Sequence, residues 1–277
     1  MTEQKPRKQV IVSGASRGIG RHAALALAQA GFHVLAGVRD PADAADLAAL
    51  HPENLTPVTL DITRAGDITA LAGALAGQPL HGLVNNAGTA ALGPLEYLPL
   101  DEIRAQFEVN LFGHIAMIQA FLPMLRAGGP GRIVNISSIS GFIAFPSFSA
   151  YAASKFALEG LSDALRRELH PQGIAVSLIQ PGNIDTDIWQ SSFTRGRALE
   201  ARLPEPGKQL YGSRFGGNAD GSDGPATKSS PEDVAAAVLQ AITAPHPKAR
   251  YLVGKDARRF ARRKSLLPDR WLDRLLR

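Results

Sequence analysis

The sequence contains no cysteine, and this absence excludes several kinds of site at once. A disulfide framework, a thiolate zinc site, an iron–sulfur cluster and a cysteine nucleophile all need the missing side chain. The chain also lacks a run of about 18 consecutive apolar residues, so no transmembrane helix is expected. Its N-terminus is polar and has no apolar stretch of signal-peptide length. We therefore expect a soluble protein of the cytoplasm.

An excess of positive charge is missing from most of the chain. The 277 residues contain 30 Lys/Arg and 25 Asp/Glu, a net charge of +5. Residues 245–277 hold 11 of the basic and 3 of the acidic residues, which leaves 19 and 22, a net −3, for the rest. This distribution argues against a nucleic-acid-binding surface, and no nucleic-acid partner is expected.

Short apolar runs alternate with helical patterns along the chain. The predicted strands are 9–13, 33–37, 56–60, 82–85, 132–136, 174–179 and 250–253, and the predicted helices are 21–30, 42–49, 68–75, 101–125, 152–168 and 231–242. Apolar runs without polar alternation are typical of strands buried on both faces, and their alternation with helices predicts right-handed βαβ units. We predict an α/β fold with a single doubly wound, Rossmann-like parallel sheet and helices on both faces.

Two segments do not follow this alternation. Residues 187–230 show no clear periodicity and include five glycines within 212–224, which favours a lid over the substrate, with an insertion of no role as the alternative. We assign residues 1–255 to the catalytic domain and residues 256–277 to a basic helical extension, which Pro268 should divide into two short helices.

A glycine-rich turn follows the first predicted strand and opens a helix. Gly14, Gly18 and Gly20 let the backbone approach a pyrophosphate, and the helix N-terminus offers free N–H groups to it. The second strand ends in Val38 and Arg39, with no carboxylate in register to bind the 2′-hydroxyl of NAD. Arg39 and Arg17 instead suit a 2′-phosphate, so we predict NADP(H); two solvated surface arginines are the alternative.

Tyr151 and Lys155 stand four residues apart at the start of a predicted helix, so their side chains share a face. A nearby ammonium favours the phenolate and lowers the pKa of a tyrosine, which makes Tyr151 a candidate general acid/base. Ser138 follows the fifth predicted strand, at the edge where such sheets bind ligands, and its hydroxyl can bond a substrate carbonyl. Alone, a Tyr-x-x-x-Lys pair is more often a surface pair.

The motifs together resemble the short-chain dehydrogenase/reductase family over about the first 185 residues, and we expect the resemblance to extend to residue 255. The matching pieces are Gly14-x-x-x-Gly18-x-Gly20, Asp61, Asn85-Asn86-Ala87-Gly88, Asn110, Ser138, Tyr151-x-x-x-Lys155 and Pro181-Gly182. Ser13 stands where the family commonly has threonine, and both residues carry a hydroxyl.

The resemblance implies a role for each matching residue. Cofactor contacts are implied for Gly14, Ser16, Arg17, Gly18, Ile19 and Gly20 at the phosphates, Asp61 and Ile62 at adenine, Asn85, Ala87 and Gly88 at the adenine ribose, and Pro181, Gly182, Ile184 and Thr186 at the nicotinamide. Asn85, Ala87 and Gly88 would also stabilise the centre of the sheet. Tyr151 would exchange the proton, Ser138 would polarise the carbonyl, Lys155 would also bind the nicotinamide ribose, and Asn110 would anchor a proton-carrying water. No metal is expected.

Aromatic residues suggest the substrate. Phe145 and Trp189 are the candidate walls of a site for a bulky apolar alcohol or ketone, and ordinary core packing is the alternative for either. Asn85–Gly93, 107–113 and 267–270 resemble the branch that contains 17β-hydroxysteroid and retinol dehydrogenases. The expected enzyme is an NADP(H)-dependent oxidoreductase, with a dinucleotide-binding redox sensor as the alternative.

The resemblance further implies a homodimer or homotetramer built on the two long helices, 101–125 and 152–168. The basic extension can lie on an anionic membrane surface. We favour the other interpretation, in which it packs on the protein's own core or on a second subunit.

Overall fold

The computed structural model describes residues 7–51, 53–212 and 229–276. Its strands are β1 Gln9–Val12, β2 His33–Val38, β3 Leu55–Thr59, β4 Leu80–Asn85, β5 Arg132–Ile136, β6 Ala175–Pro181 and β7 Arg250–Val253. They form one seven-stranded sheet in the order β3-β2-β1-β4-β5-β6-β7, and each neighbouring pair is parallel. The predicted doubly wound parallel fold is confirmed, and all seven predicted strands are present.

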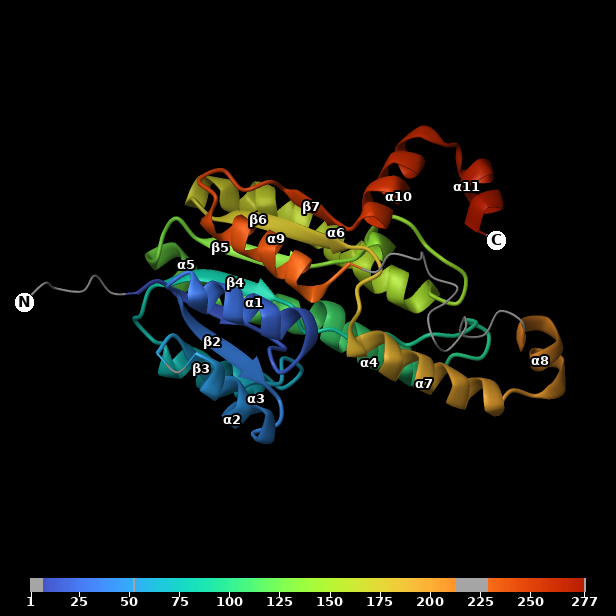
Figure 1. Cartoon of the computed structure of the whole chain (residues 1–277), viewed down its shortest axis with the longest axis horizontal. Helices are drawn as coiled ribbons and strands as arrows, with labels where there is room; N and C mark the ends of the chain where they lie inside the picture. Colours follow the sequence, from blue (N-terminus) through green and yellow to red (C-terminus); the bar gives the residue numbers. More distant parts are fainter. Residues whose placement is uncertain (1–6, 52, 213–228, 277) are drawn as a thin grey trace, which may run out of the picture.

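Helices cover both faces of the sheet (Figure 1). One layer contains α1 Gly18–Gln29, α2 Ala42–Leu50 and α9 Pro231–Thr243, and the other contains α3 Ala65–Ala74, α5 Gly113–Ala127 and α6 Ser149–Leu169. Each helix layer packs on one face of the sheet and forms a separate apolar core with it. Leu27 and Val238 lie in the first core and Phe121 and Leu125 in the second, and all four are fully buried. The sheet is therefore buried on both sides, which explains why its strands are apolar without alternation.

The helical segment Leu100–Ala127 is apolar and long enough to cross a membrane by length and composition. It consists of α4 Leu100–Phe107, a π-helical segment η1 Glu108–Phe112, and α5. Met117, Phe121 and Leu125 of this segment have no exposed surface because they pack against the sheet. Burial of this stripe in the core accounts for part of the apolar composition.

Two helices follow β6 where the sequence suggested none. They are α7 Asp187–Ala201 and α8 Glu205–Tyr211, so the prediction of an irregular segment was wrong for this part. Its helical signal was weak because arginines, glycine and threonine interrupt the apolar positions. Residues 213–228, with most of the glycine-rich stretch, lie outside the described residues.

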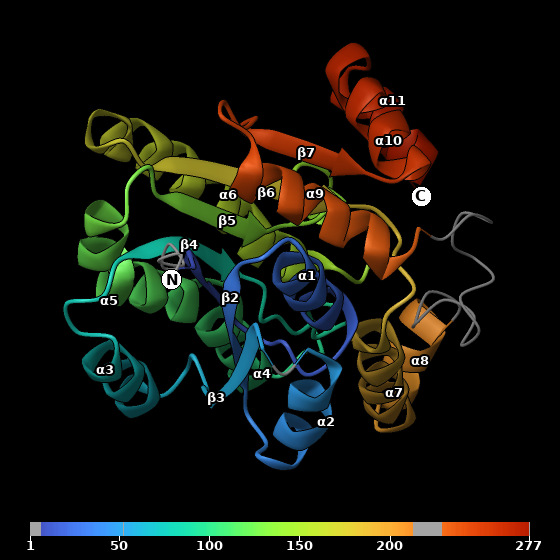
Figure 2. The same cartoon turned by 60° about the vertical axis from the view of Figure 1, so that its left-hand side comes forward.

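The C-terminal extension forms two helices, α10 Lys255–Leu266 and α11 Asp269–Leu276, which confirms the break at Pro268. The pair α7/α8 and the pair α10/α11 project from the same end of the molecule (Figure 1, Figure 2). This is the end at which the parallel strands finish, because α7 and α10 directly follow β6 and β7. The remaining short helices are η2 Ile139–Gly141, after β5, and η3 His170–Gln172.

Candidate active site

The backbone of the loop between β1 and α1 is not covered by side chains at its glycine positions. Gly14 and Gly18 have positive φ angles of 65° and 53°, which a side chain would strain. A Cβ atom on Gly14 would lie 2.9 Å from Ala87 Cα, and a Cβ atom on Gly20 would overlap the Gly14 carbonyl and the Asn86 amide. Only glycine fits these positions, and the missing side chains leave the backbone N–H groups open to a ligand.

A second loop, after β4, is bonded to the glycine loop. Ser13 Oγ accepts hydrogen bonds from the backbone N–H groups of Asn86, at 3.0 Å, and Ala87, at 3.2 Å. Asn86 Nδ2 in turn donates to the carbonyls of Ser13 and Gly14, both at 3.0 Å. Ser13 and Asn86 therefore fix the shape of the two joined loops, which we call the cradle. Sequence reasoning did not assign either of them to the site, although both stand inside quoted motifs.

The N-terminus of α1 is suited to an anion. Arg17 occupies the N-cap with an extended backbone, no side chain caps the helix, and the first turn contains no acidic residue. Across the cradle, a Cβ atom on Gly18 would lie 3.6 Å from Thr186 Cγ2, so the loop after β6 faces the glycine loop. These features fit a pyrophosphate between the two loops.

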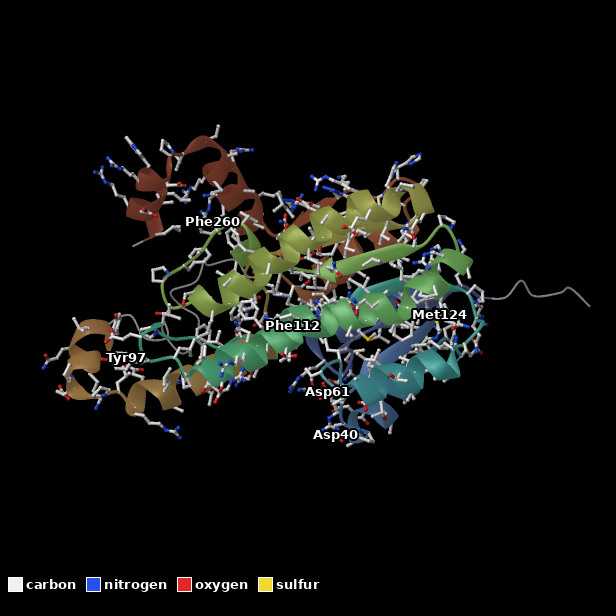
Figure 3. The ribbon with its side chains drawn as sticks, turned by 180° about the vertical axis from the view of Figure 1, so that it is seen from behind. Asp40, Asp61, Tyr97, Phe112, Met124 and Phe260 are labelled. Carbon is white, nitrogen blue, oxygen red and sulfur yellow. The ribbon has the colours of Figure 1, made fainter. Side chains whose placement is uncertain are left out.

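The carboxyl ends of β2 and β3 place charged groups beside this cradle. Arg39 is exposed. Burial raises the pKa of Asp61, but hydrogen bonds from Thr63 and the positive charges of Arg39 and Arg64 lower it by more. The net effect is a pKa of Asp61 below its usual value. Asp40 Oδ1 accepts a hydrogen bond from Ala42 N at 2.9 Å, at the start of α2. The Asp40 carboxylate is thus bound by its own turn. Figure 3 shows Asp40 and Asp61 at this end of the sheet.

Asn85 lies inside the sheet. Its side chain has no exposed surface, and its Nδ2 donates to Asn135 Oδ1 at 2.9 Å, across to β5. This position agrees with a role in stabilising the centre of the sheet, and the implied contact with the cofactor ribose stays a prediction. The other members of this motif are nearer to solvent: Asn86 and Ala87 are partly buried, and Gly88 is exposed.

Ser138, Tyr151 and Lys155 come together at the carboxyl end of β5. Tyr151 and Lys155 lie in the first turns of α6, and the Lys155 Nζ atom is 5.8 Å from the centre of the Tyr151 ring. Lys155 Nζ donates to the Ile136 carbonyl at 2.9 Å, which holds the ammonium beneath the phenol. Ser138 hydrogen-bonds to Tyr151. All three side chains are at most 5% exposed, so they meet in a dry site.

Burial perturbs both titrating groups of this set. It raises the pKa of Tyr151 to about 12, and the bond with Ser138 opposes the rise. Burial also lowers the pKa of Lys155 to about 8, against the opposing charge of Glu159. The net shift of the Tyr151 pKa is therefore upward, opposite to the shift that a neighbouring ammonium alone would cause. Tyr151 is a protonated phenol at neutral pH, which suits a general acid.

Asn110 lies within the π-helical segment, a feature frequent at functional sites. Its Oδ1 accepts from Thr89 N, and its Nδ2 donates to Thr89 O and Ser154 Oγ, all within 3.0 Å. The side chain therefore positions the loop after β4 against α6. His114, one helical turn further, is bonded to the Ala87 carbonyl, and burial lowers its pKa to about 3, so it is neutral.

An aromatic cluster covers Tyr151. Ring contacts link its members one to the next, with centroid separations of 5.4 to 6.5 Å, in the order Phe260, Phe145, Phe148, Tyr151, Trp189 and Phe193. Phe145 and Trp189, predicted as substrate-site walls, are both in it. Phe260 comes from α10 (Figure 3) and contacts Phe145 at 5.4 Å. Sequence reasoning missed Phe260 because only tertiary packing brings α10 to this loop.

The loop after β6 is anchored by a buried carboxylate. Asp256, at the start of α10, is 3% exposed, and its Oδ2 accepts a hydrogen bond from Asn183 N at 2.6 Å. The same carboxylate fills the space beside Gly182, where a Cβ atom would collide with it. Ile184 is buried and pairs with Ser229. The residues expected at a nicotinamide, from Pro181 to Thr186, are thus positioned in part by the C-terminal extension.

Comparison with known proteins agrees with this geometry. The family model for short chain dehydrogenases matches residues 8–196. Retinol dehydrogenase 5 of Mus musculus is 36% identical over 286 residues, covering 96% of this chain and 87% of that protein. The NADPH-dependent 3-dehydrocapnine reductase of Ornithobacterium rhinotracheale is 34% identical over 277 residues, covering 97% and 95%.

A solved structure is similar over nearly the whole length. The crystal structure of a short chain dehydrogenase from Burkholderia cenocepacia J2315 in complex with NADP superposes with a TM-score of 0.77 and 27% identity, covering 98% of both chains. The family match, the parallel sheet and the Ser138–Tyr151–Lys155 set lead to one conclusion. The chain is an oxidoreductase that belongs to the short-chain dehydrogenase/reductase family.

Proposed function

We propose that the protein uses NADP(H) to interconvert a ketone and a secondary alcohol on a bulky apolar substrate. The observation that carries this proposal is the meeting of Ser138, Tyr151 and Lys155 beneath an aromatic cluster. Each of these side chains has a distinct task in carbonyl chemistry. The substrate class is a narrower claim than family membership, and the structural observation that supports it is the aromatic cluster.

The bare glycine cradle and the uncapped N-terminus of α1 fit a dinucleotide pyrophosphate. When bound, the cofactor supplies the hydride for reduction and accepts it in oxidation. In reduction, Tyr151 gives its phenolic proton to the carbonyl oxygen, and Ser138 donates a hydrogen bond to the same oxygen. Lys155 stabilises the phenolate that remains by its positive charge. In oxidation, Tyr151 takes the alcohol proton.

The preference for NADP(H) rests on the charges beside the cradle. Arg17 and Arg39 are exposed, and in the described part of the chain neither has an ion-pair partner. Asp40, the next residue, uses one carboxylate oxygen in a hydrogen bond to its own turn. Two exposed guanidinium groups suit a 2′-phosphate. The solved relative with NADP and the NADPH-dependent reductase support the same cofactor.

The catalytic assignment is tested by Tyr151→Phe. We expect this variant to lose nearly all turnover and to bind NADPH as the wild type does, measured by cofactor fluorescence titration. Wild-type turnover in the variant would overturn the mechanism. Arg39→Ala tests the cofactor: it should lose at least tenfold in NADPH affinity and keep its NADH affinity, because only NADPH carries the 2′-phosphate. Equal affinity of the wild type for both cofactors would remove the NADP(H) assignment.

The substrate class is tested by a screen of steroid, retinoid, fused-ring and small aliphatic ketones, followed by NADPH absorbance. We expect the bulky apolar ketones to be turned over with the higher kcat/KM, because the cluster offers stacking surfaces to a ring. The relative Retinol dehydrogenase 5 supports this class. Turnover limited to small polar ketones would overturn it.

We also propose a cytoplasmic homo-oligomer that buries the outer faces of the two long helices. Phe112, in η1, and Phe156, in α6, are 51% and 45% exposed, which is unusual for phenylalanine. Figure 3 shows Phe112 on the outer surface. Light scattering of Phe112→Glu should give a smaller species than the wild type. An unchanged mass would exclude this interface.

A further inference from the structure

Large apolar side chains are exposed on the C-terminal helices α10 and α11. Leu266, Trp271 and Leu275 are 72%, 63% and 47% exposed. Trp271 and Leu275 are four residues apart and share one face of α11, whereas Leu272 is turned away from solvent and is 5% exposed. α11 therefore packs with one side and leaves an apolar side uncovered. We expected the extension to pack on the protein's own core or on a second subunit, and the exposed side shows that its own core does not cover all of it.

The outer face of α10 is basic. Arg259 and Arg262 lie on it with Leu266, because positions three and four apart occupy one side of a helix, and all three are exposed. Neither arginine has an ion-pair partner in the described residues. The apolar Leu266 thus ends a positive stripe at the corner where α11 begins. Residues 245–277 concentrate this charge, with 11 basic and 3 acidic residues.

We propose that the outer surface of α10 and α11 docks on an anionic lipid bilayer. Arginines near an anionic leaflet are attracted to its headgroups. Tryptophan and leucine beside them enter the boundary between headgroups and acyl chains, where tryptophan is enriched in membrane proteins. The binding strength of such a helix grows with its buried apolar area and with its attraction to anionic lipids, and this surface offers both.

The charge decides between a lipid surface and a second copy of this chain. A two-fold contact between copies brings the same patch against itself. Arg259 and Arg262 would then face Arg259 and Arg262, and like charges repel. An anionic bilayer complements the same stripe, so the lipid surface is the favoured partner.

The opposite face of α10 contacts the substrate cluster. Ala257 is fully buried, and Phe260 packs against Phe145 with 5.4 Å between ring centres. The docked bilayer would therefore lie one helix away from the aromatic cluster. A direct supply of apolar substrate from the bilayer follows only if the proposed substrate class is correct, whereas the docking itself does not depend on it.

The test is co-sedimentation of the full-length protein with vesicles of phosphatidylcholine, with and without phosphatidylglycerol. We expect at least tenfold more binding to the anionic vesicles, and loss of most of it at about 0.5 M salt, where charges are screened within a few ångströms. The chain has two tryptophans, so Trp189→Phe leaves Trp271 as the only reporter. Its fluorescence should shift to the blue with anionic vesicles as it leaves water.

Two double variants separate the contribution of the apolar side chains from that of the positive charges. Trp271→Ser/Leu275→Ser and Arg259→Glu/Arg262→Glu should each lower the affinity for anionic vesicles at least tenfold. Leu50→Ser is the matched control, since Leu50 is 45% exposed on α2, outside the extension. Equal binding of wild type and paired variants would overturn the proposal. So would a smaller mass of Trp271→Ser/Leu275→Ser by light scattering without lipid, which would assign the face to a second copy.

Discussion

The protonation state of Tyr151 gives the most direct quantitative prediction. Burial raises its pKa from 10.0 to about 12, with Ser138 opposing. Two pKa units correspond to about 3 kcal/mol and to a hundredfold smaller phenolate fraction at a given pH. At pH 8 the phenolate should therefore amount to about one part in ten thousand, where an ordinary tyrosine would have about one part in a hundred.

The two reaction directions should respond differently to pH. Ketone reduction uses the phenol, so kcat/KM should stay flat from about pH 6 to about pH 8. It should fall above this range, as Lys155, whose pKa burial lowers to about 8, loses its charge. Alcohol oxidation uses the phenolate, so its kcat/KM should rise about tenfold per pH unit over the same range.

The direct assay is the tyrosinate absorbance of the cofactor-free protein during an alkaline titration. Subtraction of the Tyr151→Phe curve from the wild-type curve isolates the single phenol. Tyr251→Phe is a matched control, because Tyr251 is also buried, at 7% exposure, but lies in β7 outside the catalytic set. A Tyr151 difference curve with its midpoint below pH 10 would refute the argument that desolvation dominates at this site.

Three further predictions concern the cradle and the aromatic cluster. Gly14→Ala should weaken NADPH binding about tenfold or more in a fluorescence titration, because its φ is +65° and its Cβ would crowd Ala87; unchanged affinity would remove Gly14 from the cradle. Ser13→Ala leaves two backbone N–H groups without an acceptor and should lower the unfolding free energy by about 1–3 kcal/mol in urea denaturation, which an unchanged midpoint would contradict. Phe145→Ala should raise KM for a fused-ring ketone several-fold and leave a small ketone unaffected, whereas Phe142→Ala, outside the cluster, should change neither.

Much of the fold was predictable because its signals are local. Buried parallel strands need continuous apolar runs, and the glycine turn needs residues without Cβ atoms, so both are written in short stretches of sequence. Ser138, Tyr151 and Lys155 were recognisable for the same reason, since spacing along one strand end and one helix face brings them together. The helices α7 and α8 escaped prediction because their apolar positions are too irregular to form a clear stripe.

The pKa of Tyr151 illustrates what spacing alone does not determine. The i,i+4 relation to Lys155 is local, and it suggests a lowered pKa, but the sign of the net shift depends on how much water the fold removes. Phe148 and Trp189, from different elements, cover the phenol, and their contribution is not visible in any short segment.

Asp256 extends the same reasoning to the C-terminal extension. Its carboxylate bonds to Asn183 N and occupies the space that Gly182 leaves, so the shape of the loop after β6 depends on a residue more than seventy positions later. The extension was assigned to a separate segment because of its charge and its proline. In the structure its inner face, with Asp256 and Phe260, completes the site, and only its outer face remains free for another partner. Because one face of α10 contacts the active site and the other face is exposed, binding at the exposed face acts on the same helix that positions the site.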